Sequence, residues 1–328
     1  MDASDTNPSK YPKTAGDRPH NGALVDKCGE FEVIECDDCG FRHVMPLPTP
    51  GELTEIYRED YYATEKPLYL EHGREDREWA ALGHDDRLDA MLQLLSPPGL
   101  PAEGQAPGLL DVGCGPGFFA ARAAEKGWRA LGVEPSRQAA AHAQTLGVEI
   151  FEDFLTRENA GELASRHGKF DAVNLTLVLE HIPDPAEMLR VVHSMLADDG
   201  LVCVTTPNDY NGFQEALREG QGYSPWWLAP PHHLNYFDFA GLERFLISAG
   251  FQPLQRLTGF PMELFLLMGE NYVGDDTLGR SCHNRRKAFD LALGGVEGGA
   301  TDTRRAFYGA LAQAGLGREA TVIARKLR

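Results

Sequence analysis

The chain lacks any long apolar segment. Crossing a bilayer as a helix takes about 18 consecutive apolar residues, and no run in this sequence approaches that length. The N-terminal segment is polar and has no apolar core of the kind found in secretory signal peptides. These absences disfavour a membrane protein and a secreted protein, so we expect a soluble cytoplasmic protein with no membrane partner.

Positive charge is scarce as well. The 328 residues include 31 Lys and Arg against 49 Asp and Glu, which gives a formal net charge of −18 at pH 7. Proteins bind nucleic acids by neutralising phosphates with Lys and Arg, and a chain this acidic would repel them. We therefore expect no nucleic-acid partner.

Cysteine is sparse, and the six residues present fit reduced thiols or metal ligands better than a disulfide framework. Cys36 and Cys39 form a Cys-x-x-Cys knuckle, a spacing that places two thiolates on one metal ion. A structural zinc site needs four ligands. Cys28 and His43 complete the predicted set, with His20 as the alternative to His43. The competing interpretation is a metal-free turn with reduced thiols.

Glycine, in contrast, is placed with a distinct spacing. Residues 109–112 form an apolar run that predicts a buried strand, and Gly113, Gly115 and Gly117 follow at alternate positions before an Ala-rich helical pattern. Glycine permits positive φ and lets a ligand approach the backbone where a Cβ would collide. A dinucleotide-binding turn requires glycine at position 118, where Phe118 stands. A dehydrogenase is therefore disfavoured.

This glycine spacing resembles the cofactor-binding turn of the class I S-adenosylmethionine-dependent methyltransferases, in which an acidic residue precedes the glycines. Further apolar runs agree with the resemblance, because residues 130–133 end at Glu134 and residues 170–179 end at the segment 180–184. Strands that alternate with helices predict a parallel α/β sheet with ligands at the carboxyl ends of its strands. The resemblance implies a Rossmann-like, doubly wound sheet of seven strands.

The resemblance also implies S-adenosylmethionine as the cofactor. Glu134 is placed to bind ribose hydroxyls, and the competing interpretation is that it only begins a loop. Asp153 or Glu152 can accept a hydrogen bond from the adenine amine, and Phe154 can stack on the ring. Asp111 either contacts the cofactor or only orients the glycine turn. The predicted cofactor residues are Asp111, Gly113, Cys114, Gly115, Gly117, Phe118, Glu134, Pro135, Asp153, Phe154, Leu177 and Glu180.

The predicted organisation has five parts. Many bacterial methyltransferases of this class carry an N-terminal Cys-containing ribbon followed by a Pro-rich turn and a Tyr-containing helix, which residues 46–62 resemble. An insertion of helices between the last two strands can cover the substrate side of the site. The parts are a disordered tail (1–23), the ribbon and helical lid (24–84), the core (85–257), the helical insertion (258–316) and the final strand (317–328).

Residues for the methyl acceptor are predicted less directly. His232, His233 and His181 are candidate proton acceptors, because histidine titrates near neutrality. Glu180, His181 and Asp184 form only a partial oxygen-rich set, so magnesium is disfavoured. Arg280 and Arg285 belong to the densest basic cluster, which either binds an anionic acceptor or forms a solvated helix face. The predicted acceptor contacts are Tyr61, Tyr62, Trp226, Trp227, Tyr236, Arg280 and Arg285, with packing in the core as the alternative for the aromatic residues.

The resemblance implies methyl transfer to an oxygen or nitrogen atom of a small molecule in natural-product or sugar metabolism. A second hypothesis is carbon methylation of a nucleotide-linked ketosugar. A third, of another class, is a non-catalytic S-adenosylmethionine sensor or partner subunit. The sequence leaves open whether the protein is a monomer or a homodimer.

Overall fold

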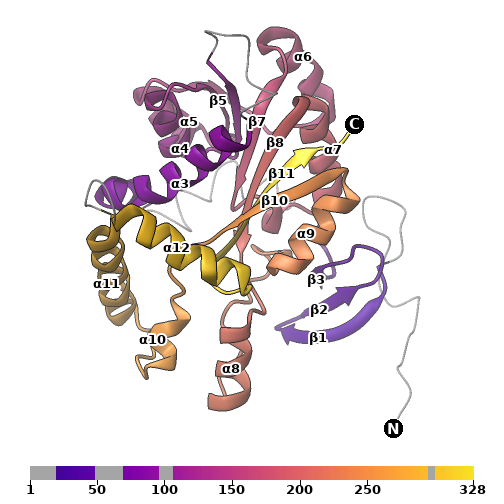
Figure 1. The fold of residues 1–328 in the computed structure, drawn as a ribbon. Coiled ribbons are helices and arrows are strands. Elements are labelled where there is room, and N and C mark those ends of the chain that lie inside the picture. The colour runs from indigo at the N-terminus through magenta and orange to yellow at the C-terminus, as the bar shows by residue number, and fades with distance from the viewer. Residues whose placement is uncertain (1–19, 49–68, 96–105, 295–299) are drawn as a thin grey trace.

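The computed structural model describes residues 20–48, 69–95, 106–294 and 300–328. Its centre is a seven-stranded sheet in the order β10-β11-β8-β7-β4-β5-β6 (Figure 1). The five strands β4 to β8 are parallel, and β11 runs antiparallel to both of its neighbours. This confirms the predicted Rossmann-like α/β fold. The strands are β4 Gly108–Val112, β5 Arg129–Val133, β6 Glu149–Phe151, β7 Phe170–Thr176, β8 Leu196–Pro207, β10 Phe251–Leu257 and β11 Glu319–Lys326.

Helices cover both faces of this sheet, which is why its central strands are apolar throughout. On one face, Leu88 and Met91 of α3 pack against Leu109 and Leu201. On the other, α6, α7 and α9 pack against alternate residues of the same strands, such as Leu110 and Val202. The covering helices are α3 Arg77–Leu95, α4 Phe118–Glu125, α5 Arg137–Thr145, α6 Arg157–His167, α7 Pro185–Met195 and α9 Phe239–Ser248.

A second, antiparallel sheet is built mainly from the N-terminal ribbon. Its order is β1-β2-β3-β9, and its fourth strand, β9 Asn235–Tyr236, comes from the part of the chain predicted as the core rather than from the N-terminus. The predicted boundary between ribbon and core therefore does not separate two independent sheets. The ribbon strands are β1 Gly22–Cys28, β2 Phe31–Cys36 and β3 Arg42–Met45.

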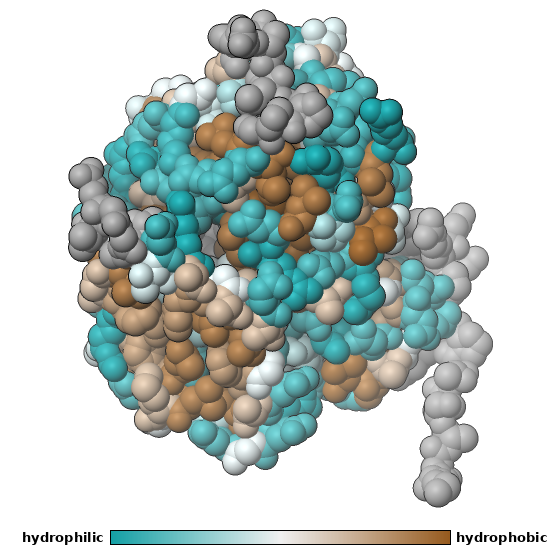
Figure 2. Space-filling model, in the orientation of Figure 1, coloured by the Kyte–Doolittle hydropathy of each residue, from teal (hydrophilic) through white to brown (hydrophobic). Residues whose placement is uncertain are grey.

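The segment between β10 and β11 is helical, and it lies beside α3 (Figure 1). Ion pairs hold this segment against α3, because Arg304 and Arg305 of the segment both pair with Asp86 of α3. Figure 2 shows apolar side chains gathered over these helices. The exposed apolar residues of this segment include Met268 and Phe289. We call these three helices the cap: α10 Glu263–Leu267, α11 Asp276–Gly294 and α12 Ala300–Gln313. The remaining helices are α2 Tyr69–Glu75, η2 Leu179–His181 and α8 Gly212–Gln221.

None of the helices within the described ranges is long and apolar enough to cross a bilayer.

Candidate functional site

The glycine turn lies at the carboxyl end of β4. Gly113, Gly115 and Gly117 all adopt positive φ, at 66°, 53° and 81°. A Cβ on Gly113 would stand 2.7 Å from Val178 Cγ2, and a Cβ on Gly117 would stand 2.5 Å from Ala143 Cβ. Glycine is therefore required both by backbone conformation and by close packing. The turn leads into α4 and presents backbone at the place where a Rossmann-like sheet binds its ligand.

Glu134, at the end of β5, fixes the position of this turn. Its side chain is buried, and its carboxylate accepts hydrogen bonds from the backbone N–H groups of Gly115 and Ser136, each at 2.8 Å. Burial raises the pKa of Glu134 to about 7, against the opposing effect of these two hydrogen bonds. Orientation of the turn, one of the two roles considered for Asp111, is therefore carried out by Glu134.

Asp111 lies near the end of β4, two residues before the turn, and its side chain is buried. Its Oδ1 accepts a hydrogen bond from Asn174 Nδ2 at 2.7 Å, whereas its buried Oδ2 has no hydrogen-bond partner within the described residues. Burial raises the pKa of Asp111 to about 6, although Asn174 and Arg87 act in the opposite direction. A buried carboxylate oxygen without a donor is costly. A ligand ammonium group at this position would remove that cost.

Arg87 is a site residue that the sequence analysis missed. It projects from α3, its Nη1 donates to Thr176 Oγ1 at 2.5 Å, and its guanidinium lies over the Phe119 ring at 4.5 Å. Thr176 is the last residue of β7, so Arg87 reaches the carboxyl edge of the sheet. No local motif marks this arginine. A carboxylate (Asp111) and a guanidinium (Arg87) at one edge complement the ammonium and carboxylate of an amino acid.

The other predicted cofactor residues also follow the parallel strands. Asp153 and Phe154 come after β6, where Asp153 Oδ1 accepts the N–H of Phe154 at 2.9 Å. Leu177 comes after β7 with φ of 55° and 43% of its surface exposed. A large apolar residue in this strained conformation is typical of a ligand-contacting position. Cys114 is buried within the turn, Phe118 begins α4, and Pro135 follows Glu134.

Glu180, His181 and His233 are brought together beyond β7, with one ligand-type atom of each within 4.8 Å of the others. His181 Nδ1 lies 2.7 Å from the carbonyl oxygen of His232. A carbonyl can only accept, so Nδ1 carries the proton and Nε2 holds the lone pair. That Nε2 lies 3.8 Å from Glu180 Oε1. The ring nitrogen of His181 that has the lone pair is thus the one directed at the Glu180 carboxyl group.

Asp184 is not part of this group. Its side chain caps α7 by accepting the N–H of Glu187 at 2.9 Å. The three groups that do converge contribute two imidazoles and one carboxylate, and magnesium prefers oxygen ligands. The ligand set considered for magnesium, Glu180 with His181 and Asp184, is therefore corrected. The observed group has His233 in place of Asp184 and so offers two nitrogen ligands and one oxygen ligand.

The ribbon holds a second group of ligand-type side chains. His20, Cys36, Cys39 and His43 have ligand atoms within 4.8 Å of one another, and His20 Nδ1 lies 3.1 Å from His43 Nε2. Cys28 is not among them, because the β1–β2 register pairs Cys28 with Phe31 at the opposite end of the hairpin from Cys36. His43 Nδ1 donates to the Val44 carbonyl at 3.0 Å, which leaves its Nε2 directed at the group.

The aromatic residues predicted to contact the acceptor are mostly structural. Trp227 and Tyr236 are buried in the core beneath the ribbon with Val33 and Leu234, and Trp226 packs on the edge of that core. Tyr236 donates its hydroxyl hydrogen to the His233 carbonyl at 3.1 Å. The prediction of Trp227 and Tyr236 as a ligand wall is corrected, because both side chains are buried in this core. Tyr61 and Tyr62 lie outside the described residues.

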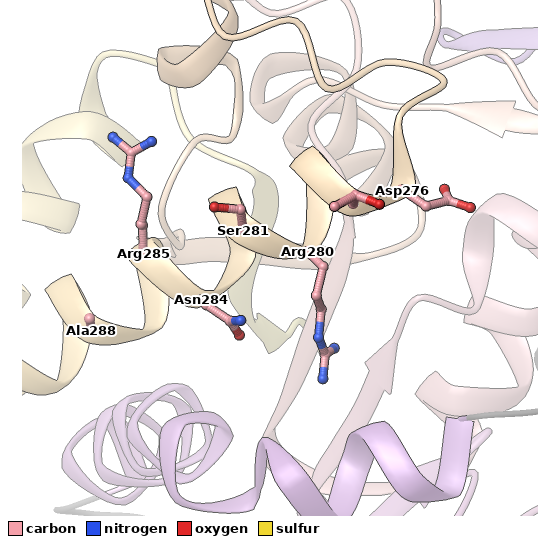
Figure 3. A pocket seen from close by; sticks show the side chains of 7 residues that line it. Asp276, Arg280, Ser281, Asn284, Arg285 and Ala288 are labelled. Atoms are coloured by element: carbon pink, nitrogen blue, oxygen red, sulfur yellow. The ribbon is translucent and has the colours of Figure 1, made fainter.

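Arg280 and Arg285 extend from opposite sides of α11 along a shallow outer pocket (Figure 3). Arg280 pairs with Glu75 and Arg285 with Glu270, and all four side chains are largely or partly exposed. These two arginines are thus already neutralised at the surface. The interpretation as a solvated helix face holds for them, and their prediction as anion ligands is corrected.

With this geometry established, comparisons with known proteins identify the class. Residues 76–256, more than half of the chain, match the family model described as "Methyltransferase domain". The chain belongs to this family and is a class I S-adenosylmethionine-dependent methyltransferase.

Curated relatives match over a shorter stretch. The chain is 36% identical over 129 residues to a ubiquinone biosynthesis O-methyltransferase of Caulobacter sp. strain K31. The aligned stretch covers 38% of this chain and 50% of that protein. The corresponding enzyme of Aeromonas salmonicida is 32% identical over 105 residues, covering 30% and 43%. The chain thus spans half or less of the length of these relatives.

Among solved structures, the chain is similar to a Burkholderia thailandensis 1,6-didemethyltoxoflavin-N1-methyltransferase with bound 1,6-didemethyltoxoflavin and S-adenosylhomocysteine. The sequence identity is 17% and the TM-score is 0.47, with 93% of this chain and 99% of that chain covered.

The close packing of the glycine turn gives a test of its role. We expect Gly117→Ala to weaken binding of S-adenosylhomocysteine at least about tenfold, since a Cβ would collide with Ala143 and displace the turn. Gly127→Ala is the matched control, because Gly127 also has positive φ but has open space around its Cα. Isothermal calorimetry measures both. Equal affinity in the two variants would contradict the assignment.

Proposed function

We propose that the protein transfers a methyl group from S-adenosylmethionine to an oxygen or nitrogen atom of a small molecule. S-Adenosylmethionine supplies the activated methyl group for in-line displacement, and the protein's task is alignment and proton removal. The observation that carries the proposal is the orientation of His181, whose Nδ1 donates to the carbonyl of His232, so that the neutral ring has its lone pair at Nε2. The names of the curated relatives support an oxygen acceptor.

In this proposal the carboxyl edge of the sheet holds the cofactor. Asp111 accepts a hydrogen bond from the ammonium group of the methionine portion, and Arg87 binds its carboxylate. Glu134 lies at the end of β5, where the ribose hydroxyls bind, and Asp153 and Phe154 contact the adenine. The unpartnered Oδ2 of Asp111 supports this arrangement, because a donor from the ligand completes its hydrogen bonding.

His181 is the proposed proton acceptor. It takes the proton from the acceptor hydroxyl or amine at Nε2, and the Glu180 carboxylate stabilises the resulting imidazolium. His232 acts through its carbonyl, which holds the ring of His181 in place. His233, whose ring centroid lies 5.0 Å from that of His181, forms the adjacent wall of the site.

Removal of this base gives the second prediction. We expect His181→Gln to lower kcat about 100-fold or more, the usual contribution of a positioned base, while affinity for S-adenosylhomocysteine stays unchanged. Methyl transfer to a panel of phenols, catechols and aryl amines measures the rate. His193→Gln, on the far end of α7, is the control and should retain full activity. A variant at position 181 with normal kcat would rule out this role.

The pKa of Asp111 gives the third prediction. In the free protein this carboxyl gains its proton as the pH falls through about 6, and the neutral form cannot pair with an ammonium group. We expect the affinity for S-adenosylhomocysteine to fall about tenfold between pH 7 and pH 5, one pH unit below that pKa. In Asp111→Asn the affinity should be low at both pH values. A wild-type affinity that does not change over this range would contradict the pairing.

We also propose that the ribbon holds a structural zinc ion through His20, Cys36, Cys39 and His43. Two thiolates and two imidazoles are a common tetrahedral ligand set for zinc. His43 pairs with Asn235 in the β3–β9 ladder, and Asn235 Nδ2 in turn donates to the carbonyls of Leu179 and Ile182. The metal-binding ribbon is thus directly attached to the segment that carries Glu180 and His181.

Zinc loading gives the fourth prediction. We expect one zinc ion per chain by mass spectrometry, and we expect Cys36→Ser to lose it because a thiolate ligand is removed. Cys28→Ser should keep the zinc, since Cys28 lies at the opposite end of the hairpin. Loss of zinc from both variants, or from neither, would contradict this ligand set.

A further inference from the structure

One face of α11 is turned toward the start of α3, and Arg285 extends from the other side of the helix (Figure 3). His283, Arg286, Lys287 and Asp290 follow helical spacing, and their contacts with Asp76 and Trp79 place this face against the start of α3. We call it the inner face of the cap. Arg286 on this face lies within electrostatic range of Glu319, the first residue of β11.

Arg286 is held rigidly on this inner face. Its Nε donates to His283 Nδ1 at 3.0 Å, and His283 Nε2, which therefore carries the ring proton, donates to Asp76 at 2.8 Å. Its guanidinium carbon lies 4.7 Å from the centre of the Trp79 ring. Burial lowers the pKa of His283, which keeps the imidazole neutral and able to accept from Arg286.

These contacts use Nε and one flat face of the guanidinium. Within the described residues the two Nη groups of Arg286 have no hydrogen-bond partner. Arginine presents its N–H groups as a planar fork that matches an oxyanion. A fork that is fixed in advance loses little conformational entropy when it binds. Arg286 thus differs from Arg280 and Arg285, which are already paired with carboxylates.

A second arginine faces the same region. Arg318 immediately precedes β11, whose first residue, Glu319, pairs with Pro207 at the carboxyl end of β8. The Arg318 side chain is 40% exposed, and the nearest carboxylate contact in the described ranges, to Glu263 Oε1, is 3.9 Å, too long for a hydrogen bond. Arg286 and Arg318 both oppose the rise in the pKa of Tyr272 that its burial causes, so both guanidinium groups lie within electrostatic range of its hydroxyl, with Glu319 within range of both.

We propose that Arg286 and Arg318 bind an oxyanion group, a carboxylate or a phosphate, on the methyl acceptor. This inference rests on the proposed methyl transfer, which it extends by naming the class of acceptor. The position of Arg318 at the carboxyl edge of β8 places the anion on the side where the sheet binds ligands. The ring of Tyr272 supplies a flat surface for the rest of the acceptor.

The test uses simple probes on the full-length protein. Inorganic phosphate and 4-hydroxybenzoate represent the two oxyanions, and the neutral 4-hydroxybenzamide is the comparison. Each is titrated by NMR with and without saturating S-adenosylhomocysteine. We expect saturable binding of at least one anion, no binding of the amide, and at least a tenfold loss of anion affinity in Arg286→Gln and in Arg318→Gln. The stronger of the two anions identifies the acceptor group.

The matched control is Arg285→Gln, the same change one residue away on α11, which should leave anion binding unchanged. Arg286→Lys guards against misfolding, since it keeps the charge but loses the fork and should also weaken binding. Thermal unfolding checks that the variants fold. The inference is overturned if neither anion saturates, or if Arg285→Gln weakens binding as much as Arg286→Gln. Failure of S-adenosylhomocysteine to bind is a separate result that contradicts the proposed cofactor site, and the titrations without it still test the anion site.

Discussion

The buried carboxylate of Glu134 is the constraint on which the site depends. It accepts the N–H groups of Gly115 and Ser136, and so ties the glycine turn after β4 to the loop after β5. The turn can take this shape only because its glycines adopt positive φ and leave room for Val178 and Ala143. Asp111 and Arg87 therefore lie beside a turn whose backbone is fixed before a ligand binds. A site on such rigid elements needs little rearrangement to hold its ligand.

The second feature of the molecule is the attachment of the ribbon to the segment that carries Glu180 and His181. Strand β9 completes the ribbon sheet, and its Asn235 also donates hydrogen bonds to Leu179 and Ile182 on either side of Glu180 and His181. The ribbon is therefore not a separate appendage. His43 of the Cys and His group pairs with Asn235 of β9, and the side chain of Asn235 in turn holds the segment that carries His181.

Local sequence was sufficient where local chemistry decides the structure. The glycine turn, the strands around it and the Cys36–Cys39 knuckle were predictable because each depends on neighbours within a few residues. The sequence did not show that His20, and not Cys28, joins the Cys and His group, because this follows from the β1–β2 register. The burial of Tyr236 was not predictable, because it follows from the pairing of β9 with β3, two segments that are far apart in the sequence, and Trp227 is buried in the same core. Arg87 and Arg286 lie in no motif, and only helix packing distinguishes them from arginines at the surface.

The central claim is that Asp111 and Arg87 recognise the amino-acid end of the cofactor product. The most direct measurement compares S-adenosylhomocysteine with 5′-methylthioadenosine, which lacks that end, in calorimetric titrations of the wild type, Asp111→Asn and Arg87→Gln. The account predicts that both variants lose about tenfold or more in affinity for S-adenosylhomocysteine and little for methylthioadenosine. An equal loss for the two ligands, or no loss for either, would contradict it.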